Sequence, residues 1–313
     1  MKIAIKKKIV LGLFSLLAIN SWAQQDAMYT HYMYNTLSVN PGYAGTRDAL
    51  TITGLNRSQW VGFEGAPVTQ TLTLHSPIAN KKIGLGLSVV NDKIGPVKNT
   101  MINADFAYQI KLNSKSKLAF GLKGGISITS IGLSSLETTT SNDISFSSSI
   151  TSKILPNFGF GVYYYTEKFY AGISTPKILE NNLSETNGNL QTSLINEQRH
   201  YFFIAGTVFD LSKMLQLKPT TFVKVTSGAP IEADLTAMFI WDKKLNLGAM
   251  YRTGDAAGLL LGYNITEQLY VGYSFDWSFV NKTMTYNNGS HELMVRYDFI
   301  FHNNKKIKSP RYF

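Results

Sequence analysis

The chain has 313 residues, of which 44% are hydrophobic, 12% aromatic and only 16% charged, and its formal net charge is +10. The charged fraction is well below the roughly 25% of soluble domains, yet a mean hydropathy of −0.05 is too low for a bundle of membrane-spanning helices. The absence of cysteine excludes disulfide scaffolds, thiol nucleophiles, cysteine zinc sites and lipoprotein acylation.

Residues 1–23 have the pattern of a secretory signal peptide. Four lysines among the first eight residues precede an apolar stretch at 9–19, and Ser21-Trp22-Ala23 is a small-x-small cleavage site. The apolar stretch is too short for an anchor helix, which needs about 20 such residues. Cleavage after Ala23 removes four of the ten net positive charges. This loss removes the main argument for nucleic acid as a partner.

The mature chain shows period-two alternation, which is the signature of β-strands. From Ile102 to Leu112 the even positions are apolar and most of the odd ones polar, and similar alternation marks 269–277 and 293–301. Fourteen segments carry the pattern: 49–60, 67–76, 83–91, 100–112, 117–130, 155–166, 168–176, 200–210, 215–226, 231–241, 243–252, 257–266, 268–277 and 290–301. Tilted strands of this length cross a hydrocarbon layer about 25 Å thick. We therefore expect an all-β, up-and-down antiparallel transmembrane barrel of about 14 strands over residues 49–301.

The connections between these segments support a barrel over a soluble β-sandwich. Barrels of the outer membrane alternate short periplasmic turns with longer extracellular loops. If the chain enters the barrel from the periplasm, the long connections 131–154, 177–199 and 278–289 all lie outside the cell. A sandwich predicts no such alternation, and a chain of this length would divide at a linker that is not present.

Residues 24–48 precede the first predicted strand. Tyr29, Tyr32 and Leu37 are spaced as on one face of a helix, and Asn40-Pro41-Gly42 then breaks any helix. The segment is either a plug inside the lumen or a periplasmic lead-in, and the sequence leaves both interpretations open.

A basic tail at 302–313 follows the last predicted strand. It contains four cations and no acid. These cations are Lys305, Lys306, Lys308 and Arg311. The tail is either a solvated end or a periplasmic docking arm that binds acidic partner surfaces.

Motifs for enzymatic chemistry are absent. The sequence has no GxSxG, Walker A or HExxH motif, and its five histidines fall at unrelated positions. We expect no catalytic, metal or cofactor site. The enzymatic alternative is a lipid hydrolase using His75, and the sequence alone does not show whether a serine lies close enough to it in the fold.

Alternation places charges of both signs on the inward face of the predicted strands. They are Asp105, Lys111, Lys123, Lys218, Lys224, Glu232, Asp234, Arg252, Asp276, Arg296 and Asp298. Mixed signs fit a braced or plugged lumen, whereas an ion-selective pore more often has one dominant sign at its constriction. A water-filled interior accounts for the same charges, so pore and plug both stay open.

Two predicted outer loops, 57–67 and 91–96, are the candidates for binding a protein partner. Their candidate contact residues are Arg57, Trp60, Phe63, Glu64, Asn91, Asp92 and Lys93. Two glycines and a proline after Trp60 indicate a tightly turned loop, which suits recognition by aromatic and charged tips. Either aromatic residue alone also fits the girdle at the membrane interface.

Several motifs resemble the PorP/SprF family of type IX secretion system outer-membrane proteins. They are Asn40-Pro41-Gly42-Tyr43-Ala44-Gly45, residues 57–67, Gly84-Leu85-Gly86-Leu87-Ser88, residues 91–96, residues 290–298 and Ser309-Pro310-Arg311-Tyr312-Phe313. The resemblance covers essentially the whole mature chain and is strongest over 25–96 and 257–313. Gly42 stands where the family usually has alanine, and 131–199 shows no family pattern.

The resemblance implies an outer-membrane barrel that works with the type IX secretion and gliding apparatus. Family members support export or surface attachment of adhesin-like cargo through a cargo C-terminal domain, beside periplasmic ring and lipoprotein components. It implies neither enzymatic activity nor a cofactor. We expect cargo contact at the two outer loops and periplasmic docking through the N-terminal segment and the tail. The alternative function is a passive porin or small-solute transporter.

Overall fold

The computed structural model describes residues 27–78, 80–132, 150–187, 190–279 and 287–300. The predicted signal peptide and basic tail lie outside these residues. Among the described residues, no helix is long and apolar enough to cross a bilayer.

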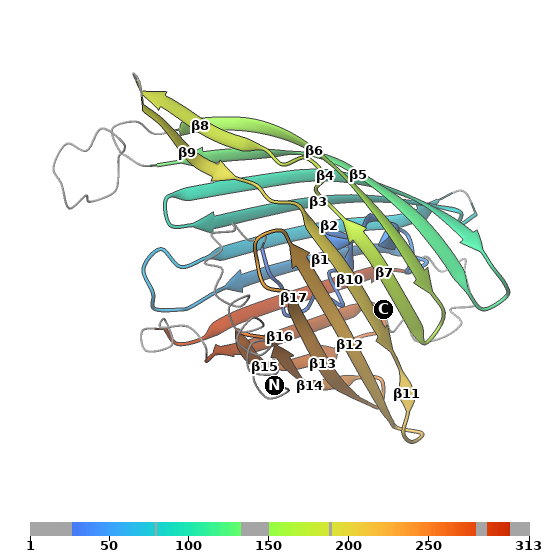
Figure 1. The fold of residues 1–313 in the computed structure, drawn as a ribbon. Helices are drawn as coiled ribbons and strands as arrows, with labels where there is room; N and C mark the ends of the chain where they lie inside the picture. The colour runs from blue at the N-terminus through green and yellow to red at the C-terminus, as the bar shows by residue number, and fades with distance from the viewer. Residues whose placement is uncertain (1–26, 79, 133–149, 188–189, 280–286, 301–313) are drawn as a thin grey trace, which may run out of the picture.

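Fourteen antiparallel strands close into a barrel (Figure 1). They are β1 (Leu50–Ser58), β2 (Val68–Ile78), β3 (Ile83–Ile94), β4 (Val97–Lys111), β5 (Lys117–Ile131), β6 (Ile150–Tyr165), β7 (Phe169–Thr175), β10 (His200–Thr207) with β11 (Phe209–Asp210), β12 (Leu215–Thr226), β13 (Glu232–Trp241), β14 (Leu245–Arg252), β15 (Ala256–Asn264), β16 (Leu269–Ser278) and β17 (Ser290–Phe299). β11 continues β10 in the same register against β12, so the two count as one strand. Pairing of β1 with β17 and of β10 with β12 closes the ring. The predicted fold class is confirmed, and each of the fourteen predicted segments overlaps one strand.

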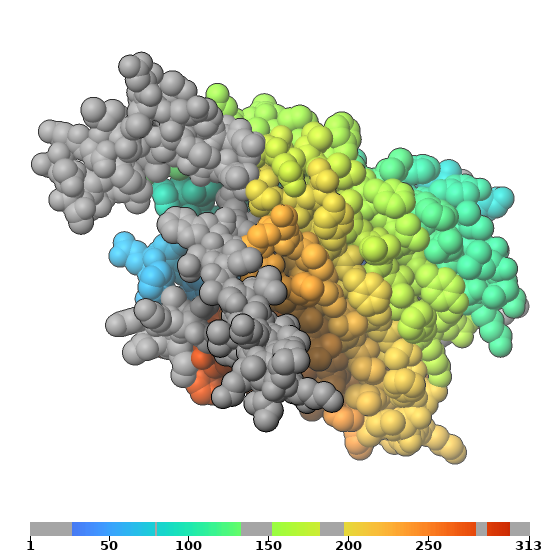
Figure 2. All heavy atoms as spheres, in the orientation of Figure 1, coloured from blue at the N-terminus to red at the C-terminus, as the bar shows by residue number. Residues whose placement is uncertain are grey.

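Alternation along each strand separates an apolar outer wall from a polar inner wall. Leu122 and Leu259 point outward and are 58% and 66% exposed, as expected for side chains that contact lipid. Thr51 and Thr53 of β1 point inward and are buried. Side chains of β6, β7, β10 and β12, green to yellow in Figure 2, form a continuous outer surface.

The two ends of the barrel differ in their connections. One end, the long-loop end, carries 59–67, 132–149, 176–199 and 279–289, together with the short connections 95–96, 227–231 and 253–255. The other, the short-turn end, carries 79–82, 112–116, 166–168, 211–214, 242–244 and 265–268. A hairpin of β8 (Asn182–Asn187) and β9 (Leu190–Asn196) forms a separate two-stranded sheet at the long-loop end.

Residues 27–49, called the plug below, lie inside the barrel. They contain the short helix α2 (Thr36–Val39) and the 3-10 helix η1 (Pro41–Tyr43). Tyr32, Met33 and Leu37 of the plug are each 1% exposed. The plug starts near the long-loop end and crosses to the short-turn end, where β1 begins.

The plug backbone rests directly on glycines of the inner wall. A Cβ atom at Gly121 of β5 would lie 2.1 Å from the amide nitrogen of Gly42, and one at Gly84 of β3 would lie 1.9 Å from the carbonyl oxygen of Ala44. Asn40 fixes this approach, because its Oδ1 accepts from the Gly42 amide at 2.8 Å and its Nδ2 donates to Val162 of β6 at 3.1 Å. Asn40 to Gly45 therefore form the segment of the plug that docks on the wall.

We predict that Gly121→Val displaces the plug. The new side chain overlaps the Gly42 backbone, and overpacking of this kind destabilises by about 1–3 kcal/mol. Urea unfolding in detergent should show the loss, and limited proteolysis should cut the plug faster. Gly54→Val is the matched control, because a Cβ at Gly54 meets nothing within 4 Å. Equal effects of both variants would contradict the docking role.

Candidate functional site

A buried ion network joins the plug to the wall near the long-loop end. The Nη1 of Arg57 lies 2.7 Å from Asp276 of β16 and 3.3 Å from Glu292 of β17. Glu292 also accepts from the backbone N–H groups of Thr30 at 2.9 Å and His31 at 2.8 Å. These side chains are at most 3% exposed. The plug therefore supplies donors to a carboxylate that arginine alone would not satisfy.

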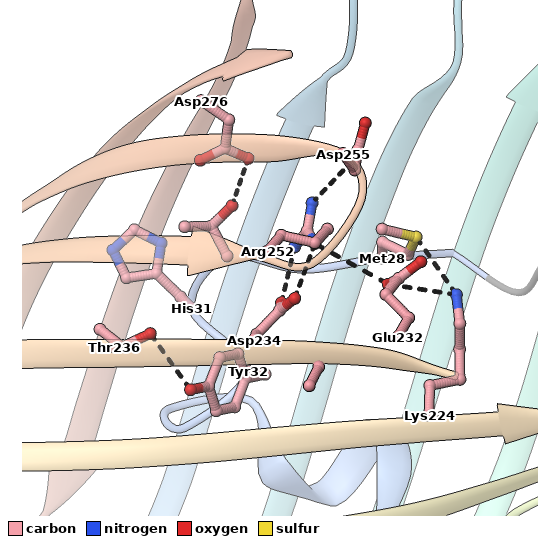
Figure 3. A network of polar contacts seen from close by, with 12 residues as sticks. Met28, His31, Tyr32, Lys224, Glu232, Asp234, Thr236, Arg252, Asp255 and Asp276 are labelled. Atoms are coloured by element: carbon pink, nitrogen blue, oxygen red, sulfur yellow. Dashed lines mark hydrogen bonds and ion pairs between the residues drawn. The ribbon is translucent and has the colours of Figure 1, made fainter. Parts of the chain in front are cut away.

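A second ion network lies beside the first on the inner wall (Figure 3). Arg252 of β14 donates to both carboxylate oxygens of Asp234 at 2.8 Å, and its Nε lies 3.8 Å from Glu232. Glu232 lies 3.4 Å from the Nζ of Lys224, which also contacts the Met28 sulfur at 3.3 Å. The start of the plug thus reaches the long-loop end of β12 and β13.

Hydroxyl contacts anchor the plug to opposite sides of the barrel. The hydroxyl of Tyr32 lies 2.9 Å from that of Thr220 on β12 and 3.1 Å from that of Thr236 on β13. The hydroxyl of Tyr29 lies 3.0 Å from that of Thr71 on β2. These bonds, together with the ion networks, hold the plug across the lumen.

The loop at 59–67 is tied to the connections on both sides of it. Val61 exchanges backbone hydrogen bonds of 2.9 and 2.8 Å with residues 288–289, and the Gly95 amide donates to the Gly65 carbonyl at 2.9 Å. Gly62 and Gly65 adopt φ values of 93° and 75°, which glycine reaches without strain. The tied set, residues 59–67, 94–97 and 287–289, is called the loop platform below.

The loop platform exposes apolar side chains at the long-loop end. Val61, Phe63 and Ile94 are 38%, 43% and 44% exposed, and Glu64 beside them is also exposed. Their backbone is held by hydrogen bonds, so a partner would not have to order it. A fixed surface of this kind with an aromatic tip suits protein recognition.

Comparison with known families identifies the chain. The model described as "Type IX secretion system membrane protein PorP/SprF" matches residues 21–297. The chain belongs to this family. The resemblance noted from the sequence motifs is confirmed, and this PorP/SprF protein is a non-enzymatic outer-membrane barrel of the type IX secretion system. A comparison with curated protein sequences gives no match.

Three solved structures illustrate the similarity of the barrel to other outer-membrane proteins. The Acinetobacter baumannii outer membrane protein Omp33 is 10% identical with a TM-score of 0.45, over 82% of this chain and all of that one. The CymD monoaromatic hydrocarbon channel is 12% identical with a TM-score of 0.46, over 81% and 88% of the two chains. A Pseudomonas aeruginosa FadL homologue is 12% identical with a TM-score of 0.44, over 80% and 89%.

The predicted partner-contact residues of the first loop lie in different environments in the structure. Placement of Arg57 in an exposed loop is wrong, because β1 continues through Ser58 and the Arg57 side chain points into the lumen. Trp60 is half-buried, and its indole Nε1 donates to the Ser278 hydroxyl at 3.4 Å. Phe63 and Glu64 remain exposed members of the loop platform.

Placement of Asn91, Asp92 and Lys93 in a loop is also wrong. Pairing of β3 with β4 continues up to Ile94 and Val97, so these three residues belong to a strand. Asp92 accepts from the Thr69 hydroxyl at 2.6 Å, while Asn91 and Lys93 are exposed on the opposite face. Lys305, Lys306, Lys308 and Arg311 lie outside the described residues.

Most of the charges that alternation assigned to the lumen are buried there, but Lys111, at the end of β4, is exposed. Sequence reasoning missed Arg47, which pairs with Asp298 at 2.8 Å, and the contact of 2.7 Å between His31 Nδ1 and Glu292. Glu292 lies two residues before the inward-facing Met294, so alternation could have found it. The plug residues carry no strand pattern that could have done so. Among the described residues, no three His, Asp or Glu side chains gather as a metal site would require.

We predict that Arg57→Ala lowers the free energy of unfolding by about 3–5 kcal/mol, because it leaves Asp276 buried without its cation and Glu292 with the His31 ring in place of the guanidinium. Urea titration of the detergent-solubilised barrel measures this loss. Lys168→Ala is the control, since it breaks an ion pair with Asp210 in which both side chains are 48% exposed. The control should change stability by less than about 1 kcal/mol. A comparably small change for Arg57→Ala would show that the network does not hold the plug.

Proposed function

We propose that this PorP/SprF protein supports export or surface attachment of an adhesin-like secreted protein by binding it at the loop platform. The observation that carries the proposal is the fixed apolar surface of Val61, Phe63 and Ile94 at the long-loop end. The alternation of long and short connections favours an extracellular position for that end. A secreted protein therefore meets this surface from outside the cell.

The plug favours a contact function over a passive porin. It crosses the lumen, and wall carboxylates hold it near both ends: Glu292 accepts from the His31 amide at 2.8 Å near its start, and Asp298 pairs with Arg47 at 2.8 Å near its finish. A wide aqueous path would require displacing the plug and breaking the buried Arg47–Asp298 pair, which is costly when a charge is left alone. A cargo protein thus contacts the mouth of the barrel and does not pass through its lumen.

The proposal also includes periplasmic docking by the tail. The last strand, β17, ends with Phe299 at the short-turn end, so the chain leaves the barrel on the side opposite the loop platform. Lys305, Lys306, Lys308 and Arg311 follow with no acid among them. Such a segment suits an acidic surface on the periplasmic ring or lipoprotein components of the secretion machinery.

The cargo half of the proposal is tested by affinity purification from detergent-solubilised outer membranes, with a tag in the 177–199 segment. We expect the wild-type protein to recover a secreted surface protein with a type IX C-terminal domain. A Val61→Ala, Phe63→Ala double variant should recover at least about tenfold less, because loss of an anchor pair costs about 2 kcal/mol or more.

Ile231→Ala is the matched control, because Ile231 is 67% exposed at the same end but lies outside the loop platform. Trp60→Ala is tested separately, since its indole contacts the barrel rim. Equal recovery of cargo by the double variant and the wild type would place recognition elsewhere.

The docking half is tested by replacing Lys305, Lys306, Lys308 and Arg311 with Glu. Charge reversal should abolish co-purification of periplasmic components, because like charges repel an acidic partner. The variant should still show the heat-dependent shift in gel mobility of a folded barrel. Replacement by Gln, which removes the charge without reversing it, should give an intermediate loss. Unchanged co-purification with the Glu variant would refute the docking role.

A further inference from the structure

A cavity of about 690 Å³ opens at the short-turn end of the lumen. The turns at 242–244 and 265–268 form its rim, and Tyr34, Tyr270 and Arg296 line its inner part. This volume is in the range of pockets that hold small organic ligands. It is much larger than a bare inorganic ion needs.

Arg296 of β17 is a buried cation of this cavity whose charge is only partly compensated. Its side chain is 7% exposed, and its Nε and Nη1 have no hydrogen-bond partner among the described residues. The nearest carboxylate oxygen, on Asp298, is 3.9 Å from Nε. Buried donors of this kind can bind a ligand, an ion or water, and here they line an open cavity.

Asp298 cannot neutralise Arg296 because its oxygens are already engaged. Arg47 of the plug donates to both of them, at 3.1 and 2.8 Å, and the Thr51 hydroxyl donates at 2.6 Å. Two arginines therefore share one carboxylate. The Nζ of a further basic residue, Lys218, lies 4.4 Å from the centre of the Tyr34 ring that forms the cavity wall.

Aromatic rings hold the Arg296 guanidinium in place. It lies 5.3 Å from the ring centre of Tyr34 and 5.0 Å from that of Tyr270. Ring faces attract a cation and fix its position, but they leave its N–H groups able to donate. A planar guanidinium with donors to spare matches the geometry of a carboxylate or a phosphate.

The rim of the cavity adds further groups that suit an anion. Lys243 and Lys244 lie on one turn, and Asn264 and Gln268 provide amide groups. The rim also carries two acids, Asp242 and Glu267, both exposed. The excess positive charge is therefore concentrated in the inner part of the cavity, where the dielectric constant is low and each charge acts most strongly.

We infer that this cavity binds an organic anion whose carboxylate or phosphate group is held by Arg296. The ligand enters from the short-turn end. Its anionic group pairs with the positive charge of Arg296 that Asp298 does not neutralise. The site lies at the opposite end of the barrel from the loop platform, so the inference is independent of the proposed cargo function.

The test measures the unfolding temperature of the detergent-solubilised protein at constant ionic strength. The probes are inorganic phosphate and trialanine with either a free or an amidated C-terminus. We expect a saturable rise of a few degrees with phosphate, with free trialanine or with both, as binding to the folded state requires. Amidated trialanine and added sodium chloride should give no rise. The two responsive probes distinguish a phosphate ligand from a carboxylate ligand.

Arg296→Met should abolish the rise while leaving the unfolding temperature without anion unchanged or higher, because it removes a buried charge that lacks full compensation. Arg296→Lys keeps the charge and the fold but lacks the planar fork, so it should bind at least about tenfold more weakly. Lys98→Met, which removes an exposed lysine at the other end of the barrel, should bind as the wild type does.

Two results would overturn the inference. One is the absence of any saturable rise in the wild-type protein with phosphate or free trialanine. The other is equal affinity of the wild type and the folded Arg296→Lys variant, which would show that the guanidinium does not bind the anion. If Arg296→Met fails to fold, Arg296→Lys still decides between these outcomes.

Discussion

Backbone hydrogen bonding in hydrocarbon is the constraint on which the whole structure depends. A strand in a bilayer must pair on both edges, because lipid offers no partner for its N–H and C=O groups. The pairing of β10 with β12 and of β1 with β17 meets this requirement by closing the sheet. Closure then fixes two surfaces of opposite character. The outer wall has to be apolar, and the inner wall is free to carry the threonines and charges that alternation places there.

A closed barrel encloses polar side chains that still need hydrogen-bond and ion-pair partners. The plug provides them: the amides of Thr30 and His31 donate to Glu292, and Arg47 pairs with Asp298. In return, the wall provides flat glycine positions such as Gly84 and Gly121 on which the plug backbone can lie. Plug and wall are therefore one folding unit. This dependence brings two motifs far apart in the chain, Asn40 to Gly45 and Gly84 to Ser88, into direct contact.

The sequence predicted the barrel well because a single local rule governs every strand. Fourteen segments of period-two alternation correspond to fourteen strands, since each residue of a spanning strand faces either lipid or lumen. The wrong loop placements lie at the ends of strands. Arg57 continues the inward series of Thr51, Thr53 and Leu55 within the predicted segment 49–60, but the predicted loop 57–67 also includes it. Asp92 continues the inward series of Ser88 and Val90 one residue beyond the predicted segment 83–91.

The site was harder to predict because it depends on contacts between distant parts of the chain. Nothing in the sequence near Val61 indicates that it pairs with residues 288–289, and nothing near Gly65 indicates its bond to Gly95. The plug segment also has no alternation to orient it, so the sequence left plug and lead-in as equal interpretations. Tertiary contacts decide these features, and they become visible only once the barrel is closed.

The ratio of buried cations to buried carboxylates differs between the two ends of the lumen, and this difference bears on function. Near the long-loop end, Arg57 faces two carboxylates, and the plug amides and the His31 ring also bind Glu292. Near the short-turn end, Arg47 and Arg296 face the single carboxylate of Asp298. Burial of a charge without full compensation is expensive, and a structure optimised only for stability would place an apolar residue there. The first arrangement holds the plug, whereas the second leaves a buried cation with which the proposed anion would pair.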